Sequence, residues 1–208
     1  MNKVGLYALI ATAALAAAPA SAATTINGSV SGVTVNSSDP GLVINASPVA
    51  FPSFTLNNAG DFVDFTVLTL GTPEGTVNIP EDFAPKPISV AFSFSSPTGA
   101  TGSAITGNTL GFINFNLFGS CGIIAGGCGQ AIFNGPSVFN FGQGGQFSVA
   151  LSNATFATPG TANVTGRFTL ISNAVPEPST WALMLLGFGA VGAAMRSPKR
   201  RRMAVSYA

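Results

Sequence analysis

The stretch Ile88-Ser-Val-Ala-Phe-Ser-Phe-Ser95 places a large apolar side chain at every second position. Successive side chains of an extended strand point to opposite faces, so all four large side chains of this stretch share one face. They are Ile88, Val90, Phe92 and Phe94. One apolar and one polar face are typical of a sheet that covers a core on one side and meets solvent on the other. The stretch therefore predicts a β-strand with a buried face.

Other parts of the chain repeat this alternation and are separated by turn residues. The turns are rich in Gly, Pro, Asn and Asp, as in Asp39-Pro-Gly41. No long run in the middle of the chain shows helical periodicity with caps. We therefore predict an all-β sandwich of about eight to ten strands, immunoglobulin-like or jelly-roll, over residues 23–174. The other alternating stretches are Ser29–Asn36, Phe62–Thr69, Gln146–Ser152 and Asn163–Ser172.

The composition of the middle of the chain narrows the possible partners. Between the two ends the chain has two cations, Lys86 and Arg167, and six carboxylates, so this part carries a net charge of −4. Such a surface cannot follow a phosphate backbone, so we exclude nucleic acid as a partner. The chain has 17 Phe, one Trp and two Tyr. Because Phe carries no polar group, we expect most of these rings in the core rather than on an exposed sugar-stacking platform.

The chain contains no histidine, which removes the commonest general base and the commonest metal ligand. We predict no catalytic residue, no resident metal and no cofactor. A hydrolase built on two carboxylates stays open, although Asp61 and Asp64 should lie on opposite faces of a strand and the required pair is not evident. A calcium site using Glu81, Asp82 or Asp39 with backbone carbonyls also stays open, without an Asp-x-Asp-x-Asp loop to support it.

Cys121 and Cys128 bracket a Gly-rich segment in a chain that we expect to be exported. In an oxidising compartment this pattern predicts one structural disulfide. A redox pair is the alternative, but the spacing is not Cys-x-x-Cys and no neighbouring cation would favour a thiolate.

Residues 1–22 have the pattern of a secretory signal peptide. Lys3 precedes an apolar run from Val4 to Ala18, and Ala20-Ser-Ala22 supplies the small residues of a cleavage site. We predict cleavage after Ala22, with Ala20 and Ala22 as the recognised residues. The Sec translocon and signal peptidase are the expected partners, and a retained anchor is the alternative.

The other end of the chain has three parts within residues 175–202, followed by a short tail at 203–208. Val175-Pro-Glu-Pro-Ser-Thr-Trp181 precedes a segment, 181–195, that carries no charge. As a helix this segment would be roughly 22 Å long, short of the roughly 30 Å hydrocarbon core, so it predicts a marginal transmembrane helix. Trp181 at one boundary and a basic cluster at the other favour insertion with the cations in the cytoplasm. The basic cluster, residues 196–202, contains Arg196, Lys199, Arg200, Arg201 and Arg202.

These residues resemble the PEP-CTERM sorting signal in its PEPxxWA variant. The match uses Pro176, Glu177, Pro178, Trp181 and Ala182, then the apolar helix and the basic cluster. The resemblance implies recognition by exosortase, an integral-membrane cysteine protease or transpeptidase of Gram-negative bacteria that make exopolysaccharide. Residues 203–208 extend past the cluster, which normally lies close to the end. An ordinary anchor that nothing cleaves is the alternative.

From these features we expect a non-enzymatic exported protein, held in the inner membrane by its C-terminal helix before processing. It would then be delivered to the cell surface or to an exopolysaccharide matrix, as in a biofilm, where exopolysaccharide is a possible partner. The alternatives are a secreted carboxylate-dependent hydrolase and a carbohydrate-binding module acting on matrix glycans.

Overall fold

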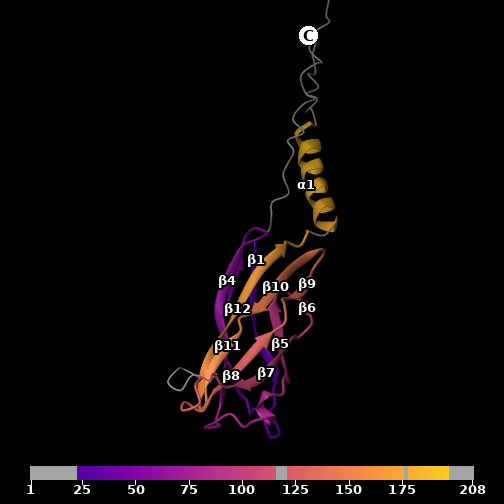
Figure 1. Cartoon of the computed structure of the whole chain (residues 1–208). Coiled ribbons are helices and arrows are strands. Elements are labelled where there is room, and N and C mark those ends of the chain that lie inside the picture. Colours follow the sequence, from indigo (N-terminus) through magenta and orange to yellow (C-terminus); the bar gives the residue numbers. More distant parts are fainter. Residues whose placement is uncertain (1–22, 116–120, 176–177, 197–208) are drawn as a thin grey trace, which may run out of the picture.

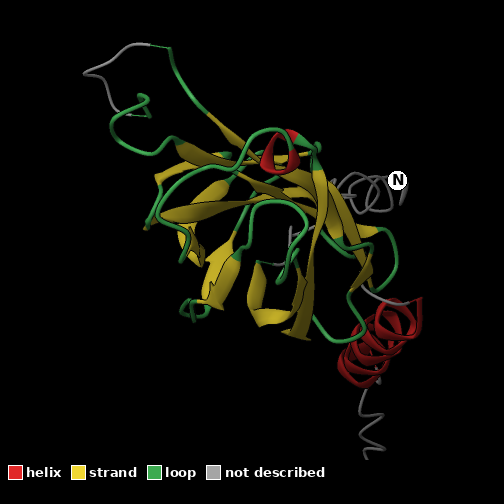
Figure 2. Ribbon diagram, turned by 60° about the horizontal axis from the view of Figure 1, so that its bottom comes forward, coloured by secondary structure: helices red, strands yellow, loops and turns green. Residues whose placement is uncertain are grey.

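The computed structural model describes residues 23–115, 121–175 and 178–196. Its strands form two six-stranded sheets, and every pair of neighbouring strands is antiparallel. Figure 2 shows the two layers, with the end far from the long helix turned toward the viewer. The predicted all-β sandwich is therefore confirmed as a two-sheet β domain.

The first sheet has the order β11-β8-β7-β5-β1-β3 and the second the order β2-β4-β12-β10-β9-β6. The strands of the first sheet are β11 (Ala154–Ala157), β8 (Cys128–Phe133), β7 (Ile105–Phe112), β5 (Lys86–Ser96), β1 (Thr24–Thr34) and β3 (Phe54–Leu56). Those of the second are β2 (Asn45–Pro48), β4 (Phe62–Thr72), β12 (Gly160–Ser172), β10 (Gly145–Leu151), β9 (Ser137–Phe141) and β6 (Thr101–Gly102). The helices are a 3-10 turn, η1 (Glu81–Phe83), and α1 (Pro178–Arg196).

Phenylalanine rings join the two sheets. Phe94 of β5 lies 5.0 Å, centre to centre, from Phe139 of β9 and 4.9 Å from Phe147 of β10, both at edge-on angles. Phe139, Phe147 and Phe168 are almost fully buried. The expectation that Phe builds the core is confirmed for these rings, because edge-on contacts let flat side chains from opposite sheets interlock.

All five alternating stretches lie in strands, namely β1, β4, β5, β10 and β12, with ends that differ from the expected ones by a few residues. Ile88 and Val90 are buried, and Phe92 and Phe94 pack against the core at half burial. The described residues contain more strands than expected because several, such as β3 and β6, are too short to show alternation.

The two ends of the β domain meet. The Thr24 hydroxyl, at the start of β1, donates a 2.7 Å hydrogen bond to the side-chain carbonyl of Asn173, one residue past β12. The register pairs Gly160 with Thr72, so the loop after β4 lies at the opposite end of the sandwich from Asn173. The segments that follow β1 and β4 therefore close the end far from the C-terminal helix (Figure 1).

Helix α1 extends away from both sheets (Figure 1). Its large apolar side chains from Leu183 onward are exposed. Across the described residues, no helix combines the length and the apolarity that crossing a membrane requires. The predicted helix is thus present, but its transmembrane character is not confirmed, in keeping with the short reach of fifteen uncharged residues. The signal peptide with Ala20 and Ala22, the positions Pro176 and Glu177, and the cations Lys199, Arg200, Arg201 and Arg202 lie outside the described residues.

Candidate functional site

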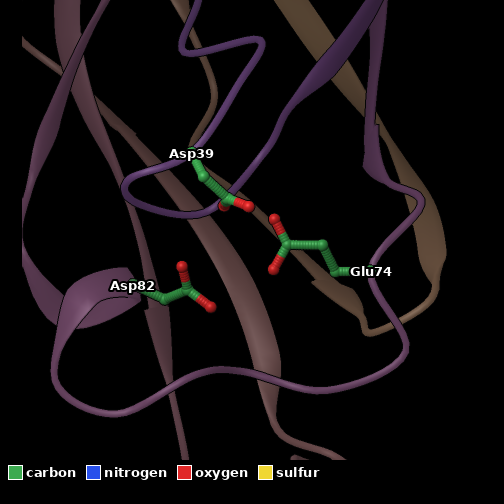
Figure 3. Close-up of side chains that lie close together, drawn as sticks. All are labelled: Asp39, Glu74 and Asp82. Atoms are coloured by element: carbon green, nitrogen blue, oxygen red, sulfur yellow. The ribbon is translucent and has the colours of Figure 1, made fainter.

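Three carboxylates from separate segments converge at the end of the sandwich far from α1. Asp39 lies in the loop between β1 and β2, Glu74 lies just after β4, and Asp82 is the middle residue of η1. One carboxylate oxygen of each lies within 4.8 Å of the corresponding oxygens of the other two. Figure 3 shows the three carboxyl groups pointing toward a shared space. We call this group the carboxylate cluster.

Backbone groups hold two of these carboxylates in place through one oxygen each. The Val43 N–H donates a 2.6 Å hydrogen bond to Glu74 Oε1, and the Asn78 N–H donates a 2.6 Å hydrogen bond to Asp82 Oδ2. The second oxygens, Glu74 Oε2 and Asp82 Oδ1, are buried and have no hydrogen-bond partner. One backbone N–H therefore fixes the orientation of each carboxylate, while its second oxygen receives no hydrogen bond.

The electrostatics of the cluster are unfavourable to three negative charges. Burial raises the pKa of Glu74 above its ordinary value of 4.5. The charge of Asp82, a proton shared between the Glu74 and Asp82 carboxyl groups, and the charge of Asp39 raise this pKa further. The hydrogen bond from the Val43 N–H acts in the opposite direction on this pKa but does not cancel the rise. The arrangement favours either a proton or a cation on Glu74.

The disulfide between Cys121 and Cys128 is present, as predicted. Cys128 opens β8, so the bridge fastens the Gly-rich loop to a strand rather than lying wholly in the loop. Gly126 has φ +79°, and a Cβ there would lie 2.5 Å from the Gly75 carbonyl oxygen. Only glycine fits this close approach with this backbone angle. The disulfide loop therefore packs against the segment that carries Glu74.

Sequence reasoning found part of the carboxylate cluster. Asp39 and Asp82 were candidates for a cation site and do come together. Glu81 does not join them: its side chain is exposed, whereas that of Asp82 is buried. Glu74 was missed, since it lies 35 positions from Asp39 and belongs to no local motif.

Asp61 and Asp64 bind different partners. Asp61 Oδ2 accepts hydrogen bonds from the backbone N–H groups of Asn57 and Asn58, in the turn before β4. Asp64 instead accepts two bonds from the Arg167 guanidinium across the β4–β12 ladder, at 2.8 and 2.9 Å. The shallow hollow beside this ion pair has a volume of about 270 Å³. Its described lining residues include no second carboxylate: Asp64, Ala150, Leu151, Ser152, Thr165 and Arg167.

The described part of the tail presents an unpartnered apolar surface. Trp181 and Ala182 are exposed at the start of α1, and Arg196 is exposed at its end. Because a folded domain seldom leaves a continuous run of Leu, Met and Phe in water, this surface indicates a contact with something apolar. The exposed residues are Leu183, Met184, Leu185, Leu186, Phe188, Val191 and Met195.

The molecule is thus an antiparallel β domain that is complete before a separate C-terminal helix begins. Residues 174–202 match the family model described as the PEP-CTERM protein-sorting motif. The chain therefore carries a PEP-CTERM sorting motif, which marks an exported, surface-directed protein with exosortase as its processing partner. No curated protein and no solved structure matches the chain.

Proposed function

We propose that this protein is a non-enzymatic surface or matrix component, displayed outside the cell after exosortase has processed its tail. The observation that carries the proposal is the sorting motif at residues 174–202, which begins only after β12 ends at Ser172. Removal of the motif would leave both sheets whole. The β domain would then be the part delivered, in an exopolysaccharide or biofilm setting.

Before processing, the tail would hold the chain at the inner membrane. The exposed apolar residues of α1 support this role, since they have no protein partner among the described residues that could cover them. The sequence adds Trp181 before and the basic cluster after this surface, the flanks expected of a helix placed at a bilayer.

A non-enzymatic role for the β domain is supported by the state of its carboxylates. Asp64 is neutralised by Arg167, and the carboxylate cluster lacks a neighbouring histidine or free thiol in a chain whose only two cysteines form the disulfide. The alternatives remain a matrix-glycan hydrolase and a carbohydrate-binding module. Release of reducing sugar that disappears in one Asp or Glu variant would establish the hydrolase, and glycan-array binding without hydrolysis would establish the module.

The sorting role is tested by comparing the mature protein from a host with active exosortase and from the same host lacking it. We expect mass spectrometry to find the chain without residues 181–208 in the first host, and the full tail in membranes of the second. A mature protein that keeps residues 181–208 in the presence of active exosortase would show that the tail is a plain anchor.

A further inference from the structure

We propose that Asp39, Glu74 and Asp82 form a calcium site at the end of the sandwich opposite the sorting tail. Two oxygens bound to one Ca²⁺ can lie up to about 5 Å apart, twice the roughly 2.3–2.6 Å length of a Ca–O bond. The carboxylate cluster meets this limit, because its three oxygens lie within 4.8 Å of one another. The three groups therefore lie close to the separations that one ion requires.

A second observation points to a ligand, namely the state of Asp82. Its side chain is completely buried, with 0% of its surface exposed, and its Oδ1 atom accepts no hydrogen bond. A buried carboxylate oxygen without a partner is costly, and such groups in proteins are paired or coordinate a metal. Glu74 Oε2 is likewise buried and accepts no hydrogen bond. Both unsatisfied oxygens would gain a cation as partner.

The hydrogen bonds to the other two oxygens act as supports for such a site. Val43 donates its backbone N–H to Glu74 Oε1, and Asn78 donates its backbone N–H to Asp82 Oδ2. Partners of this kind fix the orientation of ligating carboxylates in metal sites. Asp39 is exposed, so an ion can enter from solvent on its side.

Protein cations do not supply the missing charge among the described residues. Among the described residues, Arg167 forms an ion pair with Asp64, which is not a member of the carboxylate cluster. Lys86 is the cation closest to Asp82 in the sequence. Its aliphatic carbons lie against Gly41, two residues from Asp39. Neither cation forms an ion pair with Asp39, Glu74 or Asp82 in the part of the chain that the structure describes.

The chemistry of the donors selects calcium. All donors are oxygen atoms in a chain without histidine and with both cysteines bridged, which disfavours zinc and copper. Mg²⁺ requires a tighter octahedron, with bonds of about 2.0–2.1 Å, whereas Ca²⁺ accepts six to eight oxygens in variable geometry. Waters and backbone carbonyls would complete its shell. Extracellular calcium modules bind with dissociation constants of about 10⁻⁴–10⁻³ M, and we expect this range here.

The test uses the full chain in detergent, first treated with chelator and then titrated with CaCl₂ or MgCl₂ in a calorimeter. We expect one Ca²⁺ per chain. At about 5 mM Ca²⁺, the folding equilibrium constant should rise between about 6-fold and about 50-fold, seen as a higher Tm. The same concentration of Mg²⁺ should have a much smaller effect. No binding of Ca²⁺, or equal stabilisation by Mg²⁺, would overturn the assignment.

Two variants and one matched control locate the site. Asp82→Asn and Glu74→Gln keep the side-chain shape and should each weaken Ca²⁺ binding at least about tenfold, because each removes one charged ligand. Without Ca²⁺ both should be at least as stable as the wild type, since they relieve repulsion, and this separates lost binding from misfolding. Glu81→Gln changes the charge by the same amount next to Asp82 and should keep the full response. Equal loss in all three variants, or an unchanged response in Asp82→Asn, would contradict the site.

Discussion

The backbone N–H of Val77 donates a 2.7 Å hydrogen bond to the carbonyl oxygen of Gly126. This bond joins the segment between β4 and η1, which carries Glu74 and leads to Asp82, to the loop closed by the disulfide. The Thr158 hydroxyl lies 2.9 Å from the carbonyl oxygens of both Gly126 and Gly127 and holds the same loop from the side of β12. The disulfide-closed loop is thus hydrogen-bonded to the segment that carries Glu74 and leads to Asp82.

The first prediction follows from this support. Replacing Cys121 and Cys128 together by Ala should lower the free energy of unfolding by about 2–3 kcal/mol, as expected for a short closed loop. It should also weaken the Ca²⁺ response, because the loop that positions Glu74 becomes looser. Thr158→Val should weaken that response while the disulfide stays intact. Urea unfolding with and without Ca²⁺ gives both quantities, and two freely alkylated thiols in freshly exported wild-type protein would refute the bridge.

The second prediction concerns the Phe core. Phe168 is fully buried and its ring contacts those of Phe51 and Phe54 at 5.0 and 5.2 Å. Phe168→Ala should lower the free energy of unfolding by about 3–5 kcal/mol through the cavity that it leaves. Phe62→Ala is the matched control, because this ring is 56% exposed on the neighbouring strand β4 and lies under the Arg167 guanidinium, 4.3 Å from the ring centre. Its loss should stay under about 1 kcal/mol, and equal losses in urea unfolding would mean that the rings do not form one core.

The longer strands with large apolar residues on their buried face, such as β5 and β12, were predicted from the sequence. It missed β7, although in this strand every second residue is buried and the residues between are exposed or half-buried. The inward positions of β7 include Gly107, Thr109 and Gly111, so apolar periodicity is absent. Small residues are required there, because a Cβ on Gly111 would meet Val77 and Asp82 at 2.8 and 3.1 Å. Only two of the three residues of the carboxylate cluster were predicted for a related reason, since the cluster depends on how loops from different strands meet.

The third prediction concerns acid stability and the ion pair between Asp64 and Arg167. The hydrogen bond from Arg167 lowers the pKa of Asp64 below its ordinary value of 3.8. Because this folded-state pKa lies below the unfolded value, the pair's contribution is fully present above pH 3.8 and is lost as the pH falls through the folded pKa. Asp64→Asn and Arg167→Gln should each lower Tm slightly near neutral pH and not at all at the acid end. Thermal melts from pH 2 to 7 measure this, and a difference that persists at pH 2 would assign the effect to packing instead.

The fourth prediction is that residues 23–175, exported to the periplasm, fold without the tail. Strand β12 ends at Ser172, and the last described residue before the helix region, Val175, donates a 2.9 Å hydrogen bond to the Gln143 carbonyl within the β domain. The truncated chain should therefore show a β-type circular dichroism spectrum and unfold within a few degrees of the full chain. A helix-dominated spectrum, or loss of cooperative unfolding, would show that the tail is part of the core.

The fifth prediction separates the two parts of the sorting tail, which should fail differently. Replacing Glu177 and Pro178 by Ala should leave membrane association intact, because apolar length and the basic cluster govern insertion and orientation. Unprocessed chain should then accumulate in the inner membrane, just as in a host without exosortase. A matched double change outside the motif, Ser172 and Asn173 to Ala, should leave processing unchanged.

Replacing Arg200, Arg201 and Arg202 by Glu tests the other part, because it reverses most of the cytoplasmic charge while leaving the recognition residues in place. The tail should then be translocated out of the membrane, so that the chain loses both membrane retention and processing. Deletion of exosortase does not reproduce this phenotype. Fractionation followed by mass spectrometry of the C-terminal peptide distinguishes the two outcomes. If the Glu177 and Pro178 variant is processed normally, the strip before the helix is not what the enzyme recognises, and the basic cluster or the helix itself must carry the signal.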